Sequence, residues 1–145
     1  MIALLQRVQH ANVVVNDEII GEIKQGILLL IGVEKKDNEE TANRLCERYL
    51  SYRVFSDEQD KMNLSVKDIA GGVLLVPQFT LAADTRKGNR PSFSSAADPE
   101  LGEKLFNHIV SRTKELHSNV ATGQFGADMK VSLLNDGPVT FWLQV

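Results

Sequence analysis

The sequence of 145 residues contains one cysteine, three histidines and no apolar run long enough to cross a membrane. Cys46 has no partner for an internal disulfide, and His10, His108 and His117 lack the paired spacing of a metal site. The longest aliphatic run, Ile27 to Ile31, is far shorter than the ~20 residues of a membrane-spanning helix. We therefore predict a protein without a disulfide, a bound metal or a membrane anchor.

An excess of positive charge is also absent. Sixteen basic and nineteen acidic residues give a net charge of −3, so the chain has no broad basic surface and would hold a nucleic acid only locally. The apolar start, Met1 to Leu5, is interrupted at once by Gln6 and Arg7, which argues against a signal peptide and predicts a cytoplasmic protein. The size and the ordinary composition predict one globular domain, residues 1–145.

The first third of the chain has the patterns of β-strands. The β-branched and aliphatic residues in 2–8 and 13–15, then 19–23 beyond Asn16-Asp17, predict an N-terminal hairpin. Residues 26–33 are aliphatic without alternation, which indicates a strand buried on both faces, and Val73 to Val76 form a second such run. The strand over residues 26–33 should therefore lie in the middle of a sheet.

Two helices and two closing strands complete the expected α/β fold. Asp37 and Glu40 predict a capped helix whose apolar stripe includes Cys46 as a core residue, and Asp98-Pro99 begins a second helix that runs to His117. Alternating residues in 127–133 and 139–145 predict two strands on either side of a connecting segment, Asn135 to Pro138.

Two segments carry residues that a plain structural role does not demand. Gln78 and Thr80 follow a buried strand and Pro77, so they place an amide and a hydroxyl at the rim of a sheet. Gly137-Pro138 is either a plain turn or a cis peptide bond, and the sequence leaves both open. The long polar segment 82–97, with Arg86, Lys87 and Arg90, is either a phosphate-binding loop or a solvated one.

These two segments resemble motifs of the D-aminoacyl-tRNA deacylases, cytosolic hydrolases that release D-amino acids from mischarged tRNA. Gln78-Phe79-Thr80-Leu81 is similar to the family's Ser-Gln-Phe-Thr motif, and the residues 135–140 are similar to its Gly-Pro motif. The resemblance covers the whole chain, and Pro77 stands where the family commonly has serine. It implies a curved mixed β-sheet with helices packed on it, and no cofactor.

The resemblance also implies a homodimer with composite sites. Gly137 and Pro138 of one subunit would enter the pocket of the other and present two carbonyl groups to the substrate's chiral centre. An L side chain would then be excluded, while D-residues of many kinds would be accepted. Glycine has no side chain to exclude, so glycyl-tRNA is an expected second substrate. Arg7 would brace the Gly-Pro element.

The implied reaction is hydrolysis of the ester at the tRNA 3′ end. Thr80 is either a nucleophile or a residue whose backbone N–H, with that of Phe79, stabilises the oxyanion while the ribose 2′-OH assists water. We favour the second mechanism because no neighbouring base is evident in the sequence. Gln78 would orient substrate or water, and Phe125 and Met129 would contact the terminal adenine. The alternatives are a non-catalytic module that binds the tRNA 3′ end and a hydrolase of small D-amino-acid esters.

Overall fold

The sheet is organised around β1 (Ile2–Val15), which pairs antiparallel with three other strands. The computed structural model describes residues 1–145. Residues 2–8 of β1 pair with β3 (Gly26–Gly32), residues 11–15 pair with β2 (Glu18–Ile23), and β8 (Lys130–Gln144) pairs along nearly the whole strand. The expected N-terminal hairpin is therefore present, with its first strand unbroken.

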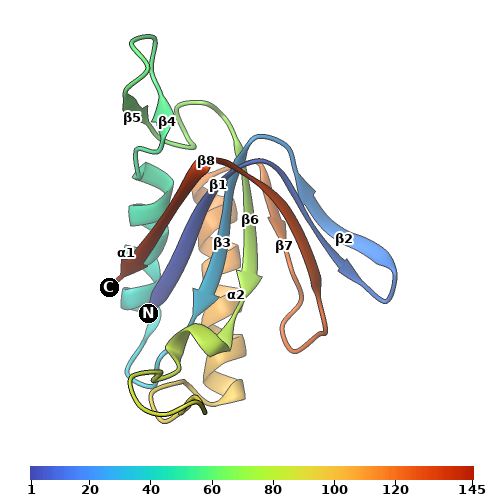
Figure 1. Ribbon diagram of the computed structural model, residues 1–145, viewed down its shortest axis with the longest axis vertical. Coiled ribbons are helices and arrows are strands. Elements are labelled where there is room, and N and C mark those ends of the chain that lie inside the picture. The colour runs from blue at the N-terminus through green and yellow to red at the C-terminus, as the bar shows by residue number, and fades with distance from the viewer.

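The other side of β3 carries the parallel part of the sheet. β3 pairs in parallel with β6 (Gly72–Pro77), and β6 pairs in parallel with β7 (Val120–Thr122), a short strand that the sequence patterns did not reveal. The sheet curves until β2 approaches β7: a Cβ on Gly21 would lie 2.6 Å from the carbonyl oxygen of Thr122. The mixed sheet is thus curved and nearly closed (Figure 1).

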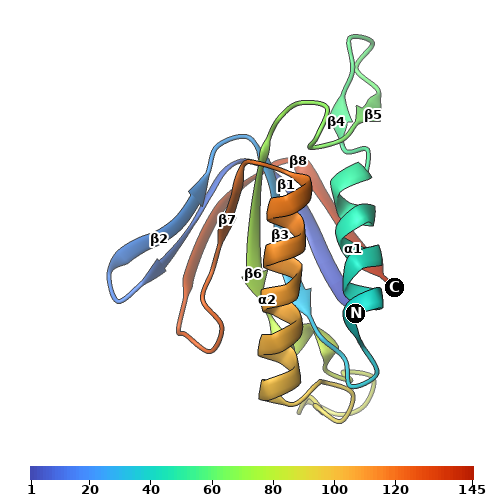
Figure 2. The same cartoon turned by 180° about the vertical axis from the view of Figure 1, so that it is seen from behind.

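Two helices cover one face of this sheet. α1 (Glu39–Ser51) and α2 (Pro99–Leu116) lie side by side on it, as Figure 2 shows from behind. Between α1 and β6, the strands β4 (Phe55–Ser56) and β5 (Met62–Leu64) form a small projecting hairpin. A 3₁₀ helix, η1 (Phe79–Ala82), follows β6 directly. The single-domain α/β class predicted from the sequence is confirmed.

Both faces of the central strands are buried, as their lack of alternation predicted. Ile27 and Leu29 of β3 pack under the helices, whereas Leu28 belongs to a second cluster inside the curve of the sheet. Members of that second cluster from β6 are Leu74 and Val76. Because two separate apolar clusters hold β3 and β6, the end of this strand pair is a fixed platform.

The helix starts were predicted with unequal success. Asp98 caps α2 by accepting a hydrogen bond from the Leu101 N–H at 2.9 Å, with Pro99 in the first turn, as expected. The cap of α1 is Asn38, which forms a capping box with Thr41, and the prediction of Asp37 was wrong. The Asp37 carboxylate instead accepts from the N-terminal ammonium group and from the Glu34 N–H.

The closing segment is one strand, and the prediction of two strands was wrong. Between the pairs Gln6–Thr140 and Val8–Asn135, β1 advances two residues while β8 advances five. The three extra residues form a bulge that contains Gly137-Pro138, whose peptide bond is cis. Because β1 continues past the bulge, β8 resumes pairing on the other side of it.

The closest backbone approach in the parallel ladder gives a test of the fold. A Cβ on Gly26 would lie 1.9 Å from the carbonyl oxygen of Gly72, so β3 and β6 must separate to admit it. We expect Gly26→Ala to lower the free energy of unfolding by about 3 kcal/mol or more in urea titrations. As the control, Gly88→Ala meets no atom within 4 Å and should cost about 1 kcal/mol, from its φ of +68° alone. Equal losses for the two variants would contradict this packing.

Candidate active site

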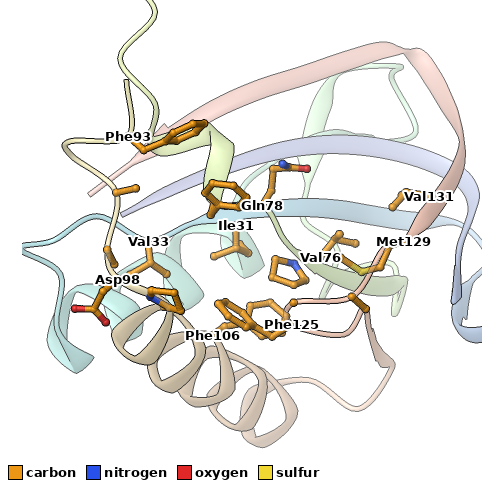
Figure 3. A pocket seen from close by; sticks show the side chains of 18 residues that line it. Ile31, Val33, Val76, Gln78, Phe93, Asp98, Phe106, Phe125, Met129 and Val131 are labelled. Atoms are coloured by element: carbon orange, nitrogen blue, oxygen red, sulfur yellow. The ribbon is translucent and has the colours of Figure 1, made fainter. Parts of the chain in front are cut away.

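A largely apolar pocket of about 640 Å³ lies where β3 and β6 end. This volume falls within the ~300–1,000 Å³ typical of sites for small ligands. Its walls come from the end of β6, the segment 93–99 with the start of α2, and the segment 125–131. In Figure 3, Gln78 lies between Phe93 on one side and Met129 and Val131 on the other.

The rim of this pocket is formed by the segment from Pro77 to Thr80. The Gln78 N–H donates to the Ile31 carbonyl oxygen at 2.7 Å, which extends the β3–β6 ladder by one bond. Pro77 is tolerated because alternate N–H groups of a strand point to opposite sides, and β7 has already stopped pairing at Thr122. The chain then turns into η1, so its first residues are held at a fixed place on the rim.

Two backbone donors are available at the start of η1. The Leu81 N–H is the first to bond within the turn, to the Gln78 carbonyl oxygen at 3.2 Å. The N–H groups of Phe79 and Thr80 precede it, and η1 itself has no acceptor for them. Two adjacent N–H groups beside a pocket are the arrangement that stabilises an oxyanion.

The Thr80 hydroxyl has an amide, and no base, as its neighbour. The Gln78 Nε2 group donates a hydrogen bond to Thr80 Oγ1, and Thr80 is exposed. Asp98 is the one titratable side chain that lines the pocket, and its carboxylate is occupied by the cap of α2. Since an alcohol nucleophile needs an adjacent base, this surrounding does not suit Thr80 as the nucleophile.

Phe125 and Met129, the two residues expected to contact the terminal adenine, both line the pocket. The Phe125 ring packs near that of Phe106, with centroids 6.4 Å apart, and closely over Gly102 of α2. The Met129 sulfur accepts a hydrogen bond from the Gln124 N–H at 3.4 Å and lies against Gly123. Together they form an apolar wall of the pocket, with an aromatic ring and a thioether of the kind on which a base packs.

The other three expected site residues lie elsewhere on the same subunit. Arg7 pairs with Ile27, four residues back along β3 from the pocket residue Ile31, which is about 13 Å along the strand. Gly137 and Pro138 bulge from β8 close to Arg7, and both are exposed. The pocket of one subunit therefore contains Gln78, Phe79, Phe125 and Met129 without the Gly-Pro element.

Arg7 ties the Gly-Pro bulge to the body of the protein. Its Nε donates to the Asp136 carbonyl oxygen at 2.9 Å and its Nη1 donates to the Val54 carbonyl oxygen at 2.6 Å. Asn135 closes the bulge by accepting from the Val139 N–H at 2.7 Å. A Cβ on Gly137 would meet Val139 Cγ2 at 2.8 Å and Arg7 Nη2 at 3.1 Å, and its φ of +137° already favours glycine.

Phe93 is a pocket residue that the sequence analysis did not single out. Its ring packs against that of Phe79, with centroids 5.2 Å apart, and both rings lie at the pocket mouth. The only sequence signal is an aromatic residue inside a long polar loop, where an exposed ring has no packing role.

In the same loop the Arg86 guanidinium, hydrogen-bonded to Asp84, holds the pKa of that carboxyl well below its usual range.

Comparison with known proteins identifies the family. A family model described as D-Tyr-tRNA(Tyr) deacylase matches residues 4–144. A protein called D-aminoacyl-tRNA deacylase from Cronobacter sakazakii (strain ATCC BAA-894) is 61% identical over 145 residues, which is 100% of both chains. The protein of the same name from Janthinobacterium sp. (strain Marseille) is 62% identical over 100% of this chain and 97% of its own length.

This chain belongs to the D-aminoacyl-tRNA deacylase family. It is accordingly an ester hydrolase whose substrate is tRNA that carries a D-amino acid. A solved structure described as c-Myc DNA Unwinding Element Binding Protein is 36% identical, with a TM-score of 0.96 over 100% of this chain and 99% of that chain.

A more distant structure supports the fold alone. It is described as a probable eukaryotic D-amino acid tRNA deacylase and is 16% identical, with a TM-score of 0.89 over 99% of this chain and 98% of that chain.

Neither helix of this deacylase-family chain is long and apolar enough to cross a membrane. No three His, Cys, Asp or Glu side chains gather in a way that could hold a metal ion.

The single thiol lies far from this chemistry, in the core. Cys46 is fully buried in α1, where it accepts a hydrogen bond from the Tyr49 hydroxyl at 3.3 Å and lies 3.8 Å from the hydroxyl of Thr113. Burial raises the pKa of the Cys46 thiol and, more strongly, that of the Tyr49 phenol. The interpretation of Cys46 as a core residue agrees with this placement.

We expect Cys46 to be inert in the folded enzyme. Its raised pKa leaves less thiolate at pH 8 than an ordinary cysteine has, and its burial blocks access. A colorimetric disulfide reagent should label the thiol only as urea unfolds the protein, and deacylation should be insensitive to the reagent. Because no other cysteine exists, the signal is unambiguous. Rapid labelling of the native enzyme with loss of activity would contradict this assignment.

Proposed function

We propose that each active site of this deacylase is built from two subunits of a homodimer. The observation that carries the proposal is the separation, within one subunit, of the Gly137-Pro138 bulge from the pocket that holds Gln78 and Phe79. A rigid sheet cannot bring them together, whereas a symmetric dimer can place the bulge of one copy at the pocket of the other. The exposure of Gly137 and Pro138 is consistent with an element that projects outward.

In this site the bulge selects against L-amino acids. The carbonyl oxygens of Gly137 and Pro138 would accept from the substrate's α-ammonium group, while the backbone fills the volume that an L side chain needs. Rejection by exclusion requires no pocket fitted to each side chain, so D-residues of different kinds are accepted. Arg7 supports this role because its hydrogen bonds to Asp136 and Val54 fix the bulge.

Glycyl-tRNA is a second substrate of the proposed site. Glycine has no side chain on either side of its α-carbon, so steric exclusion by the backbone of residues 137 and 138 gives no discrimination against it. Glycine attached to a non-cognate tRNA is then removed by the same pocket.

The chemistry proceeds by direct attack of water on the ester carbonyl. The N–H groups of Phe79 and Thr80 stabilise the oxyanion, Gln78 orients the substrate or water, and the neighbouring ribose 2′-OH assists the attack. The ester C–O bond breaks, and the ribose oxygen leaves with a proton, which gives a free D-amino acid and tRNA. The amide neighbour of the Thr80 hydroxyl supports this route over a covalent one.

The terminal adenine packs on Phe125 and Met129, which line the pocket. A protein that only bound a tRNA 3′ end would use the same residues, and the 36% identical structure is described as that of a nucleic-acid-binding protein. A small-ester hydrolase would not need the adenine surface. Hydrolysis is favoured because the two free N–H groups of η1 serve no purpose in binding alone.

Since charged tRNA is used in the cytoplasm, we place the enzyme there.

The oxyanion site can be tested by removing one backbone donor. Phe79→Pro removes both the ring and the N–H, whereas Phe79→Ala removes the ring and keeps the N–H. Proline is compatible with the first position of a 3₁₀ helix, and Gln78 before it, with φ of −144° and ψ of 81°, lies outside the α region that a following proline disfavours. We expect kcat of Phe79→Pro to be about 10²–10³ lower than that of Phe79→Ala. Equal kcat values for the two variants would exclude the Phe79 N–H as an oxyanion donor.

Thr80→Ala separates the two roles of Thr80. It keeps the N–H and should retain most of kcat on D-tyrosyl-tRNA, because the hydroxyl is not the nucleophile. Mass spectrometry of the wild-type enzyme during turnover should detect no acyl-enzyme. Near-complete loss in Thr80→Ala, together with a trapped acyl group, would show that Thr80 is the nucleophile instead.

Chiral selection can be tested at Gly137, where an added methyl group must displace Val139 or Arg7. Wild type should cleave D-tyrosyl-, D-aspartyl- and glycyl-tRNA and leave L-tyrosyl-tRNA intact. Gly137→Ala should lose about 10²-fold in kcat/KM on the D-esters, because the carbonyl groups shift by about an ångström. Circular dichroism should show that the fold is kept. If the variant remained fully active and D-selective, the bulge would not be the selective element.

A further inference from the structure

Two exposed phenylalanine rings form an aromatic surface at the pocket mouth. Phe79 is 59% exposed and Phe93 is 42% exposed, values far above those of the buried aromatic side chains of this protein. Their rings are tilted by 43° to each other, with centroids 5.2 Å apart. We call these two side chains the aromatic pair. The adenine surface, Phe125 and Met129, lies elsewhere in the same pocket, on the segment that precedes β8.

Backbone hydrogen bonds hold Phe93 in place on an otherwise long polar loop. Asp84 and Ser92 exchange two hydrogen bonds, of 2.7 and 3.0 Å, immediately before Phe93. After Phe93, the Lys35 N–H donates to the Ser95 carbonyl oxygen at 3.1 Å. The Ser95 hydroxyl donates to the Ala82 carbonyl oxygen at 2.7 Å. A ring presented by a braced loop loses little conformational entropy when a ligand packs on it.

The same loop carries a local positive charge on an acidic protein. Residues 83–97 contain three basic side chains and one acidic one, against a net charge of −3 for the chain. The Arg86 guanidinium donates two hydrogen bonds to the Asp84 carboxylate, of 2.8 and 2.7 Å, so its charge is already paired. Lys87 and Arg90 take part in none of the ion pairs of the structure, so their charges are available to an anion.

We propose that the aromatic pair binds the base of the nucleotide that precedes the terminal adenosine of the tRNA, with Phe93 as its main support. The proposal rests on the proposed function, in which the terminal nucleotide occupies the pocket. Single-stranded nucleic acids are commonly bound by aromatic rings that stack on successive bases, beside basic residues that contact the backbone. The loop 83–97 supplies both components.

The direction of the RNA follows from the two ends of the pocket. With the terminal adenine on Phe125 and Met129 and the ester at Gln78, the chain has to leave past the remaining wall. Figure 3 shows Phe93 across the pocket from Met129 and Val131, with Gln78 between them. The preceding base therefore meets the aromatic pair, and Lys87 and Arg90 contact the phosphates that follow. Since any base has a flat face, this contact adds affinity without reading sequence.

A binding experiment tests the stacking without any hydrolysis. The probe is the trinucleotide CCA with a free 3′ end and a fluorescent cytidine analogue in the middle position, whose emission falls when it stacks. Binding to wild type should lower the fluorescence emission of the probe. Phe93→Leu should bind the probe roughly tenfold more weakly with little loss of emission. Phe93→Tyr should regain both the affinity and the loss of emission. Equal quenching by wild type and Phe93→Leu would overturn the proposal.

A hydrolysis assay distinguishes failure of the base-stacking proposal from failure of the proposed function. For D-tyrosyl esters, the ratio of kcat/KM on CCA to that on adenosine alone should fall about tenfold in Phe93→Leu, through KM, and recover in Phe93→Tyr. If wild type cleaved neither ester, the proposed function would fail, whatever the trinucleotide did. If both esters were affected equally, the aromatic pair would not bind a second base, and the proposal would fail alone.

Two further measurements test whether the aromatic pair is instead a contact between subunits and whether Lys87 and Arg90 contact phosphates. Sedimentation of Phe93→Leu should give the same mass as wild type; a lower mass would make the aromatic pair a contact between subunits and overturn the proposal. Neutralising Lys87 and Arg90 together should reduce the slope of log binding constant against log salt by about 1.4, at ~0.7 for each phosphate that a basic side chain no longer neutralises. Glu103→Gln on α2, outside the loop, is the matched control, and an unchanged slope in the double variant would contradict the phosphate contacts.

Discussion

The parallel ladder between β3 and β6 is the constraint on which the active site depends. It begins where Gly26 and Gly72 approach without side chains between them, and it ends where the Gln78 N–H bonds to Ile31. Apolar clusters on both faces hold the two strands, so the first residues of η1 have a fixed position. In the proposed mechanism, the enzyme therefore presents backbone N–H groups to the reacting carbonyl without reorganising them, which is the condition under which such donors are most effective.

A second constraint comes from β1, which orders the opposite end of the molecule. Its pairing with β8 is interrupted by three extra residues of β8, and the bulge so formed is tied to the body through Arg7. The proposed catalytic rim and the proposed selective element are thus both rigid, and they are held apart by the length of the strands. In the proposed homodimer a second subunit would resolve this separation, because the fold itself has no hinge between them. Under the same proposal, selection by a rigid backbone explains how one pocket accepts D-residues with different side chains.

Much of this arrangement could be predicted from the sequence, because local patterns report on burial. The aliphatic runs of β3 and β6 and the Asp98-Pro99 helix start have direct physical causes, and the motif around Gln78 indicated the rim. Other features depend on tertiary contacts. Asn38 rather than Asp37 caps the first helix, because the N-terminal ammonium group engages the Asp37 carboxylate. The bulge in β8 depends on the length of its partner β1, and Phe93 became a pocket residue only through loop contacts that are distant in sequence.

The most direct test of the two-subunit site mixes two inactive variants. Phe79→Pro damages the rim and Gly137→Ala damages the bulge, and subunits of the two are combined by unfolding and refolding, with a tag on one to confirm mixed dimers by sedimentation. In a mixed dimer one site combines an intact rim with an intact bulge and the other has neither. Random reassociation should restore about a quarter of wild-type activity on D-tyrosyl-tRNA, since half of the dimers are mixed and each has one working site. Activity that stayed at the average of the two variants would mean that each site lies within a single subunit, and the account would be wrong.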